Sequence, residues 1–341
     1  MSPTPAAPSA SSGSLLSSEA KPAYIETIRA EYRKVTEAHE RAEREKQRLP
    51  LARARANNHK IDWANYTPPK PSFLGTKVFD SWDLAELARY IDWTPFFQTW
   101  ELKGRYPNIL NDEKQGEAAR QLFEDAQAML AKIIAEKWFA PRAVVGLWPA
   151  NAVGDDIKLF TDESRSNELA TFFTLRQQLA KRDGKPNVAL SDFVAPQDSG
   201  KADYIGGFVV TAGIEEVAIA ERFERANDDY NSILVKALAD RFAEAFAERL
   251  HERVRKEFWG YVPDEAYQPD DLIGEPYHGI RPAPGYPAQP DHTEKVTLFR
   301  LLDAERNAGV QLTESMAMWP GSSVGHLSCP PGSLLFRRSE G

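Results

Sequence analysis

The stretch DDYNSILVKALADRFAEAFAERLHERVRK, Asp228–Lys256, contains the clearest periodic pattern in the chain. Its apolar side chains recur every four residues, at Leu234, Leu238, Phe242, Phe246, Leu250 and Val254. Such spacing places them on one face of an α-helix, which is typical of a helix that packs against a core. The pattern predicts a long helix over residues 215–258, with a break near residues 228 and 229.

Shorter helix and strand patterns surround this helix. Residues 114–137 and 295–309 each predict an amphipathic helix, the second of which stops at a glycine. Residues 142–162 predict a strand, a turn and a second strand, and residues 203–214 and 312–324 predict further strands. The mixture is α plus β and lacks the regular βαβ alternation of a nucleotide-binding fold.

Two local signals refine this pattern. The glycines at 206 and 207, inside a predicted buried strand, indicate that another group approaches the backbone closely. Thr94, which precedes Pro95, predicts a helix N-cap followed by proline at the first helical position.

Composition excludes several classes of protein. The 341 residues include 42 basic and 50 acidic side chains, for a net charge of −8, which argues against a nucleic-acid partner or an anionic membrane surface. The single cysteine, Cys329, excludes a disulfide framework and makes a reducing cytoplasm the simplest location. No apolar run approaches the length needed to cross a bilayer.

The beginning of the chain differs in composition from the rest. Residues 1–18 are mostly serine, proline and alanine and have no secretory-signal pattern, which predicts a disordered linker. Residues 19–60 predict a helical arm, because apolar residues from Ile25 to Val35 recur at spacings of three and four before a charged run. One folded domain is expected over residues 61–324.

The usual signatures of catalysis and metal binding are missing from the sequence. It has no G-x-G-x-x-G after a strand, no P-loop, no H-E-x-x-H and no G-x-S-x-G. The six histidines show no metal-ligand spacing. We therefore expect no catalytic residues and no bound metal, and the remaining polar groups suit the binding of a small zwitterionic or cationic ligand.

The segment RPAPGYPAQPDHTEK, residues 281–295, is the most unusual stretch. Four prolines within ten residues prevent a regular helix and remove hydrogen-bond donors from any strand. Arg281 in this stiff frame has the geometry to bind a carboxylate through two parallel hydrogen bonds. A role in pinning the loop to the domain is about equally consistent with the residues alone. Tyr286 supports a ligand or fills a gap in the core.

Two acidic residues are further candidates. Asp92 lies among aromatic residues in RYIDWTPFFQTW, where a carboxylate requires a donor, and the simpler interpretation is that it caps the following turn. Glu244 lies on a different helix face from Phe242 and shares that face with Asp240 and His251. The simpler interpretation of this polar line is a solvated surface.

Several stretches together resemble the reactivation domain of cobalamin-dependent methionine synthase, the module that binds S-adenosylmethionine. The resemblance runs from about residue 15 to 324, and its most specific motifs are DWTPFF and RPAPGYP. It implies an α+β fold, a single C-shaped domain with a twisted antiparallel sheet flanked by helices. The disordered tail and the helical arm would precede this domain.

The resemblance also implies a function. The domain would bind S-adenosylmethionine as the methyl donor that restores an oxidised cobalamin, and the cobalamin itself would be bound by a separate domain. A flavodoxin or flavodoxin-like reductase would supply an electron. By motif, Asp92, Glu244, Arg281 and Tyr286 would contact the ligand. Pro284, Gly285 and Ala288 would belong to the same site, with Gly285 allowing close approach of the backbone to the ligand.

The chain departs from the family pattern after residue 324. An aromatic pair and a closing strand are expected there, but the sequence reads GHLSCPPGSLLFRRSEG. We interpret residues 325–341 as an aberrant, disordered tail from a truncated or frameshifted gene end, which predicts an exposed sheet edge and a tendency to aggregate. Two other hypotheses stay open: a docking module for the reductase or the cobalamin domain without ligand binding, and a fragment without function.

Overall fold

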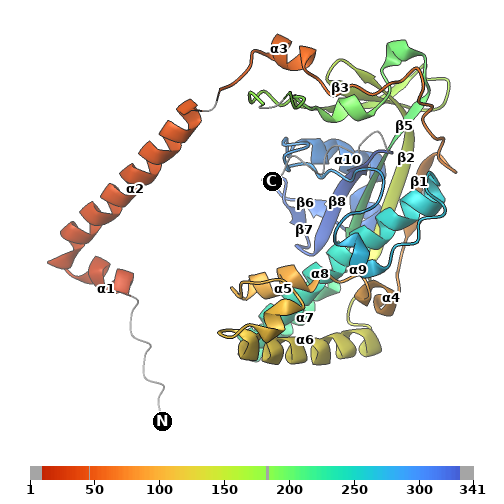
Figure 1. Ribbon diagram of the computed structural model, residues 1–341. Coiled ribbons are helices and arrows are strands. Elements are labelled where there is room, and N and C mark those ends of the chain that lie inside the picture. Colours follow the sequence, from red (N-terminus) through yellow and green to blue (C-terminus); the bar gives the residue numbers. More distant parts are fainter. Residues whose placement is uncertain (1–9, 46, 182–183, 331–341) are drawn as a thin grey trace. The chain divides into compact units, whose positions relative to one another are not determined.

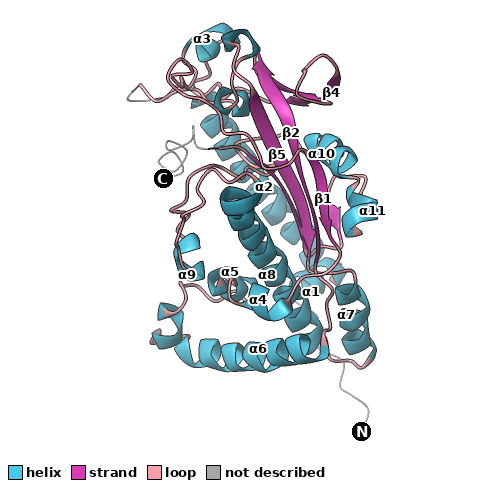
Figure 2. Ribbon diagram, turned by 90° about the vertical axis from the view of Figure 1, so that its right-hand side faces the viewer, coloured by secondary structure: helices cyan, strands magenta, loops and turns pink. Residues whose placement is uncertain are grey.

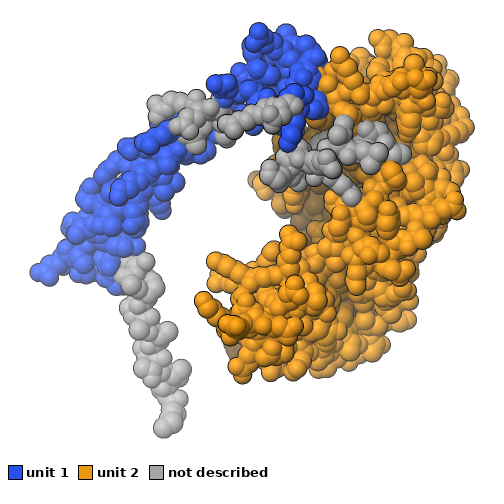
Figure 3. Space-filling view, viewed as in Figure 1, with its two compact units in different colours: residues 1–57, 177–187 blue, residues 58–176, 188–341 orange. Residues whose placement is uncertain are grey.

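The computed structural model describes residues 10–45, 47–181 and 184–330. The chain divides into two compact units, one formed by residues 1–57 and 177–187 and the other by residues 58–176 and 188–341 (Figure 3). The smaller unit thus includes residues 177–187, which the sequence analysis placed within the folded domain.

The helices of the smaller unit lie in its N-terminal part, and the described residues of 177–187 contain no helix. Its helices are α1 (Ala10–Leu16), α2 (Ala20–Glu45) and α3 (Leu51–Ala56). The predicted disordered linker over residues 1–18 is therefore wrong for residues 10–16, and residues 1–9 lie outside the described part of the chain. Ser, Ala and Leu are all compatible with an α-helix, so a high content of Ser and Ala does not by itself exclude a short helix.

The larger unit contains the sheet and the helices that cover it. Its main helices are α4 (Leu84–Ala88), α5 (Trp93–Thr99), α6 (Gly116–Glu136), α7 (Glu215–Arg225), α8 (Asp229–Arg253), α9 (Pro269–Leu272), α10 (Glu294–Leu302) and α11 (Ala304–Ala308). Short helical turns are η1 (Asn108–Asn111), η2 (Leu190–Phe193), η3 (Gln197–Ser199) and the π-helical η4 (Val254–Phe258). Its strands are β1 (Gly75–Phe79), β2 (Arg142–Val153), β3 (Asp156–Phe160), β4 (Glu168–Phe173), β5 (Asp203–Thr211), β6 (Gln311–Leu312), β7 (Met318–Trp319) and β8 (Ser323–Ser328).

An antiparallel sheet forms the centre of the larger unit (Figure 1). Its strand order is β4-β3-β2-β5-β8. β1 pairs with residues 143–147 of β2, whereas β3 pairs with residues 150–153 of β2. The longest pairing joins β2 to β5, from Arg142 opposite Thr211 to Ala150 opposite Asp203. β6 and β7 form a separate two-stranded ribbon. The predicted α+β class with an antiparallel sheet flanked by helices is confirmed.

The sheet is buried on both faces at its central strands β2 and β5, whereas β1 and β4 have several exposed residues. Successive side chains of a strand point to opposite sides, so neighbouring residues of β2 and β5 enter different core clusters. Val145 and Phe208 belong to one core cluster, together with residues of α6 and α8. Val144 and Val209 belong to the other cluster, together with residues of α10 and α11. Figure 2 shows α8 on one side of the sheet and α10 with α11 on the other. Every member of the predicted α8 stripe is almost completely buried.

The predicted long helix over residues 215–258 is confirmed together with its break. α7 ends at Arg225 and α8 begins at Asp229, where the side chain of Asp228 accepts a hydrogen bond from the backbone N–H of Asn231. An N-cap aspartate satisfies a backbone donor that the helix itself leaves unpaired, so it marks the start of a new helix.

The glycines of β5 serve packing within the core. A Cβ atom at Gly207 would lie 2.6 Å from a methyl carbon of Leu298 on α10, and one at Gly206 would lie 2.9 Å from Leu147. The predicted close approach is confirmed, and the approaching groups are side chains of the same domain. Any larger residue would push α10 away from the sheet.

The N-cap prediction at residue 94 is wrong by two residues. α5 begins at Trp93, and the Asp92 carboxylate accepts a hydrogen bond from the Thr94 backbone N–H at 2.9 Å. Aspartate is as good an N-cap residue as threonine. Asp92 precedes Thr94 in the chain, so the helix begins after Asp92 and Thr94 lies in its first turn. The simpler interpretation of Asp92 as a cap is confirmed.

The predicted disordered tail from residue 325 onward is wrong for its first residues. β8 pairs with β5 from Ser323 opposite Thr211 to Ser328 opposite Gly206. The outer edge of β8 is also bonded, because Leu327 N–H donates to the Pro282 carbonyl and Cys329 pairs with Ile280 in both directions. The edge predicted to be exposed is therefore covered there. Residues 331–341 lie outside the described part.

None of the helices in the described ranges is long and apolar enough to cross a membrane.

We expect Leu238→Ala to lower the free energy of unfolding by about 2–5 kcal/mol, since Leu238 is fully buried on α8. The control is Ile233→Ala on the same helix, where the side chain is 46% exposed and the expected loss is below about 0.5 kcal/mol. Urea unfolding measures both values. Equal losses would show that the stripe does not face the core.

We expect the amide hydrogens of β8 to exchange at least about 100-fold more slowly than those of an unstructured peptide of the same sequence, because β8 pairs with β5 along its length and its C-terminal end also bonds to residues 280–282. Hydrogen–deuterium exchange with mass spectrometry on peptides covering residues 323–329 measures this protection. Exchange at the unstructured rate would restore the interpretation of a disordered tail.

Candidate functional site

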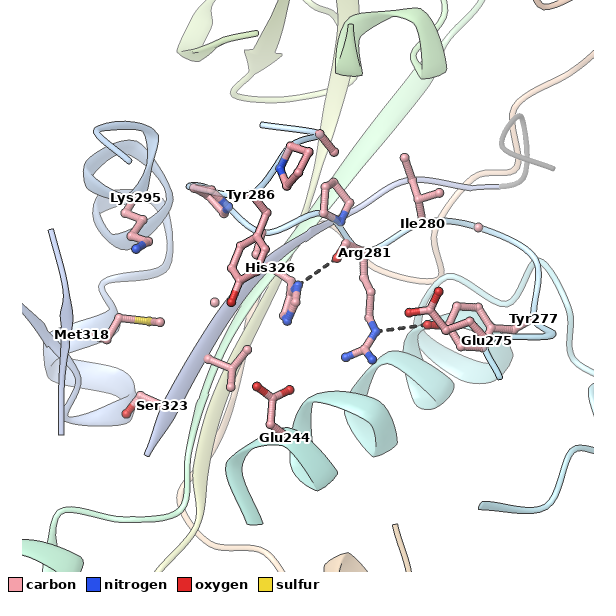
Figure 4. Close-up of a pocket in the computed structure, with 18 of the residues that line it drawn as sticks. Glu244, Glu275, Tyr277, Ile280, Arg281, Tyr286, Lys295, Met318, Ser323 and His326 are labelled. Carbon is pink, nitrogen blue, oxygen red and sulfur yellow. Dashed lines mark hydrogen bonds between the residues drawn. The ribbon is translucent and has the colours of Figure 1, made fainter. Parts of the chain in front are cut away.

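A pocket of about 670 Å³ lies in the larger unit, within the size range of small-molecule sites. Its lining comes from α8, the segment over residues 274–288, α10, β7 and β8. Figure 4 shows the Arg281 guanidinium and the Glu244 carboxylate directed toward the same space, with Tyr286 and His326 beside them. The pocket therefore collects both charges and aromatic surface.

The proline-rich segment forms one wall of the pocket, and backbone bonds hold it in place. Pro282 and Pro284 are buried, and the Pro282 carbonyl accepts from β8. Gly285 has φ +99°, and a Cβ atom there would lie 2.2 Å from the His292 ring. Proline restricts the unfolded chain and glycine permits the turn, so the wall is stiff before any ligand binds.

Arg281 is held from two sides, and one of its guanidinium nitrogens has no partner in the part of the chain that the structure describes. Its Nη2 donates to Glu248 Oε2 at 2.7 Å, and its Nε donates to the Tyr277 hydroxyl at 3.1 Å. Its Nη1 is buried and has no hydrogen-bond partner among the described residues. A buried guanidinium nitrogen requires an acceptor, which makes Nη1 a ready donor for an anionic ligand group.

A second arginine, Arg255, packs against the tyrosine that binds Arg281. Arg255 is completely buried and donates to Glu265 at 2.5–3.2 Å and to His251 Nδ1 at 2.7 Å. Its guanidinium carbon lies 3.9 Å from the centre of the Tyr277 ring. The ion pair with Glu265 holds Arg255, and the cation–π contact of Arg255 holds the Tyr277 ring. The hydroxyl of this tyrosine in turn orients Arg281.

The predicted solvated face of α8 divides into two environments. Glu244 is exposed and lines the pocket, whereas His251 on the same face is fully buried. Burial lowers the pKa of His251 well below its usual value, with Arg255 adding to the effect, so this imidazole is neutral. Partial desolvation in the pocket raises the pKa of Glu244, while Arg241 and Arg281 oppose that shift.

The structure brings together most of the residues expected at the site. Arg281, Glu244, Tyr286, Pro284 and Ala288 line the pocket, and Tyr286 is 67% exposed at its rim.

Two expected positions differ from this group. Gly285 is not part of the lining, and its close neighbour is His292. Asp92 caps α5 and does not line the pocket, so a ligand contact from Asp92 stays a prediction.

Sequence reasoning missed Tyr277, Glu248, Lys295 and His326. Tyr277 and Glu248 hold Arg281, and Lys295 and His326 line the pocket. Glu248 lies one helical turn after Glu244, so the spacing of acids on α8 was the available signal. His326 lies in the part of the chain interpreted as a disordered tail, where no pattern pointed to a strand.

No cluster of three or more histidine, cysteine or acidic side chains that could hold a metal ion occurs within the described ranges.

Comparisons with known proteins identify the family of this chain. Residues 83–336 match the family described as "Vitamin B12 dependent methionine synthase, activation domain". A solved structure described as "Crystal Structure of the MetH Reactivation Domain bound to AdoHcy" shares 55% sequence identity and aligns with a TM-score of 0.81. That alignment covers 84% of this chain and 88% of the other. The family match continues past residue 324, where the sequence analysis ended the folded domain.

We expect Glu248→Ala to lower the free energy of unfolding by about 3–5 kcal/mol, because it leaves the buried Arg281 guanidinium without its anion. Glu244→Ala, one helical turn earlier, is the matched control, and its expected effect is below about 1 kcal/mol because this carboxylate is exposed. Urea unfolding of both variants measures the difference. A similar small effect from both would show that the Glu248 pair contributes little.

Proposed function

The chain belongs to the family of vitamin B12-dependent methionine synthase activation domains, and from this premise we propose that its pocket binds S-adenosylmethionine for the reactivation of cobalamin. The observation that carries the proposal is the buried Nη1 of Arg281, which has no hydrogen-bond partner among the described residues, in a side chain that lines the pocket together with Glu244. The related reactivation domain was solved with AdoHcy, the demethylated form of this ligand.

The charges of the pocket complement those of the ligand. S-adenosylmethionine has an α-carboxylate, an α-ammonium and a sulfonium group. Arg281 Nη1 binds the carboxylate, and the hydrogen bonds from Nη2 and Nε keep the guanidinium plane from rotating away. Glu244 supplies a negative charge for the cationic part, and the exposed ring of Tyr286 offers an aromatic face at the rim.

The protein's contribution to the reaction is orientation of the methyl donor. Cobalamin, bound by a separate domain, would supply the metal centre for the methyl transfer. The residues of this chain hold the amino-acid end of the donor against a stiff wall, so little freedom is lost when the ligand binds. Methionine formation therefore requires the other domains of the synthase, and this chain alone positions S-adenosylmethionine.

Partners and location follow from the same role. The reactivation proposal requires docking to the cobalamin-binding domain and an electron from a flavodoxin or flavodoxin-like reductase. A reducing cytoplasm suits the free and buried thiol of Cys329, the single cysteine of the sequence.

We expect Arg281→Lys to weaken S-adenosylmethionine binding about 10- to 100-fold, measured by isothermal titration calorimetry. Lysine retains a positive charge beside Glu248 but lacks the planar fork, so Nη1 is lost while the buried carboxylate keeps a cation. Circular dichroism checks that the variant is folded.

The control is Arg300→Ala, which removes an exposed arginine of α10 and is expected to leave binding unchanged. Unaltered binding by Arg281→Lys would place the ligand carboxylate elsewhere. No binding by the folded unaltered chain would overturn the ligand proposal and favour the docking module.

A further inference from the structure

His326 has one ring nitrogen whose role in the pocket remains open. Its Nδ1 lies 2.8 Å from the backbone carbonyl oxygen of Arg281. A carbonyl oxygen only accepts hydrogen bonds, so Nδ1 carries the proton and Nε2 of the neutral ring has a lone pair. Nε2 is buried and has no hydrogen-bond partner among the described residues. An acceptor in that position requires a donor.

The ring remains neutral under ordinary conditions. Burial lowers the pKa of His326 to about 3, and the nearby Arg281 guanidinium adds to this effect. Nε2 therefore keeps its lone pair at neutral pH and acts as an acceptor. The other side of the ring packs against Phe208, with ring centres 5.4 Å apart, which limits how the imidazole can turn.

The two unpartnered groups belong to neighbouring parts of the same wall. Within the described residues, Arg281 Nη1 is a donor without a partner, and the Arg281 carbonyl accepts from the imidazole whose Nε2 is an acceptor without a partner. Figure 4 shows both side chains at the same side of the pocket. An α-amino acid carries an acceptor group, the carboxylate, and a donor group, the ammonium, on one carbon atom.

We propose that His326 Nε2 accepts a hydrogen bond from the α-ammonium group of the ligand whose carboxylate is bound by Arg281 Nη1. The inference rests on the proposed function and deepens it. His326 becomes a specificity-determining residue that requires the amino group of the ligand, while Glu244 is left to face the sulfonium. His326 lies in the segment that the sequence analysis interpreted as an aberrant tail.

Two variants test the roles of the two imidazole nitrogens independently. In His326→Asn the amide nitrogen occupies the place of Nδ1, so the bond to the Arg281 carbonyl is kept and the acceptor is removed. In His326→Gln the amide oxygen reaches the place of Nε2, so the acceptor is kept and the bond to the carbonyl is lost. A purely structural role predicts the opposite order of effects, because only the bond to the carbonyl holds the wall.

The probes are S-adenosylhomocysteine and its deaminated analogue, in which hydrogen replaces the α-amino group, titrated into the folded full chain by calorimetry. We expect His326→Asn to weaken S-adenosylhomocysteine binding at least about 10-fold, which is the effect expected for losing a hydrogen bond to a charged group. We expect His326→Gln to weaken it less than about 3-fold, because the acceptor is kept. Neither variant should alter the affinity for the deaminated analogue.

Two results would overturn the inference while the proposed function stands. One is binding of S-adenosylhomocysteine by His326→Asn as tightly as by the unaltered chain. The other is an equal loss for both probes in His326→Asn, which indicates a structural effect. Failure of the unaltered chain to bind S-adenosylhomocysteine would remove the proposed function itself, and this inference with it.

Discussion

The ion pair between Arg281 and Glu248 is the interaction on which the arrangement of the pocket depends. It joins the proline-rich segment to α8 at 2.7 Å, in surroundings where both side chains are largely removed from water. Burial raises the pKa of Glu248, and the two arginines beside it oppose that shift. An unpaired buried charge in this position would cost free energy of folding, so the ion pair fixes the position of the proline-rich segment against α8.

β8 connects the sheet to the same wall. One edge of the strand continues the sheet from β5, and the other edge bonds to the backbone of residues 280–282. The strand thereby extends the core and directs His326 and Ser323 toward the pocket. A segment with little sequence pattern thus takes part in both folding and binding, since main-chain hydrogen bonds are available to almost any residue.

The prediction of helices and strands succeeded where periodicity was strong. The stripe of α8 and the interruption near residue 228 follow from spacing and capping chemistry, which are local properties of the chain. The candidate Arg281 was found through its proline frame, and Glu244 through its position on a helix face. Glu248 was overlooked because a carboxylate one turn further along gives the same helical pattern whether it is solvated or buried.

The sequence by itself determined the α+β class, the core face of α8, the family resemblance and two charged groups of the candidate site, Arg281 and Glu244. These depend on residue order and on the periods of helix and strand. Only the tertiary structure decided that Asp92 caps a helix away from the pocket lining and that residue 325 lies in a strand. It also decided that Arg281 Nη1 has no partner among the residues that the structure describes. Burial and pairing depend on segments distant in the chain that meet only after folding, and for that reason no local pattern records them.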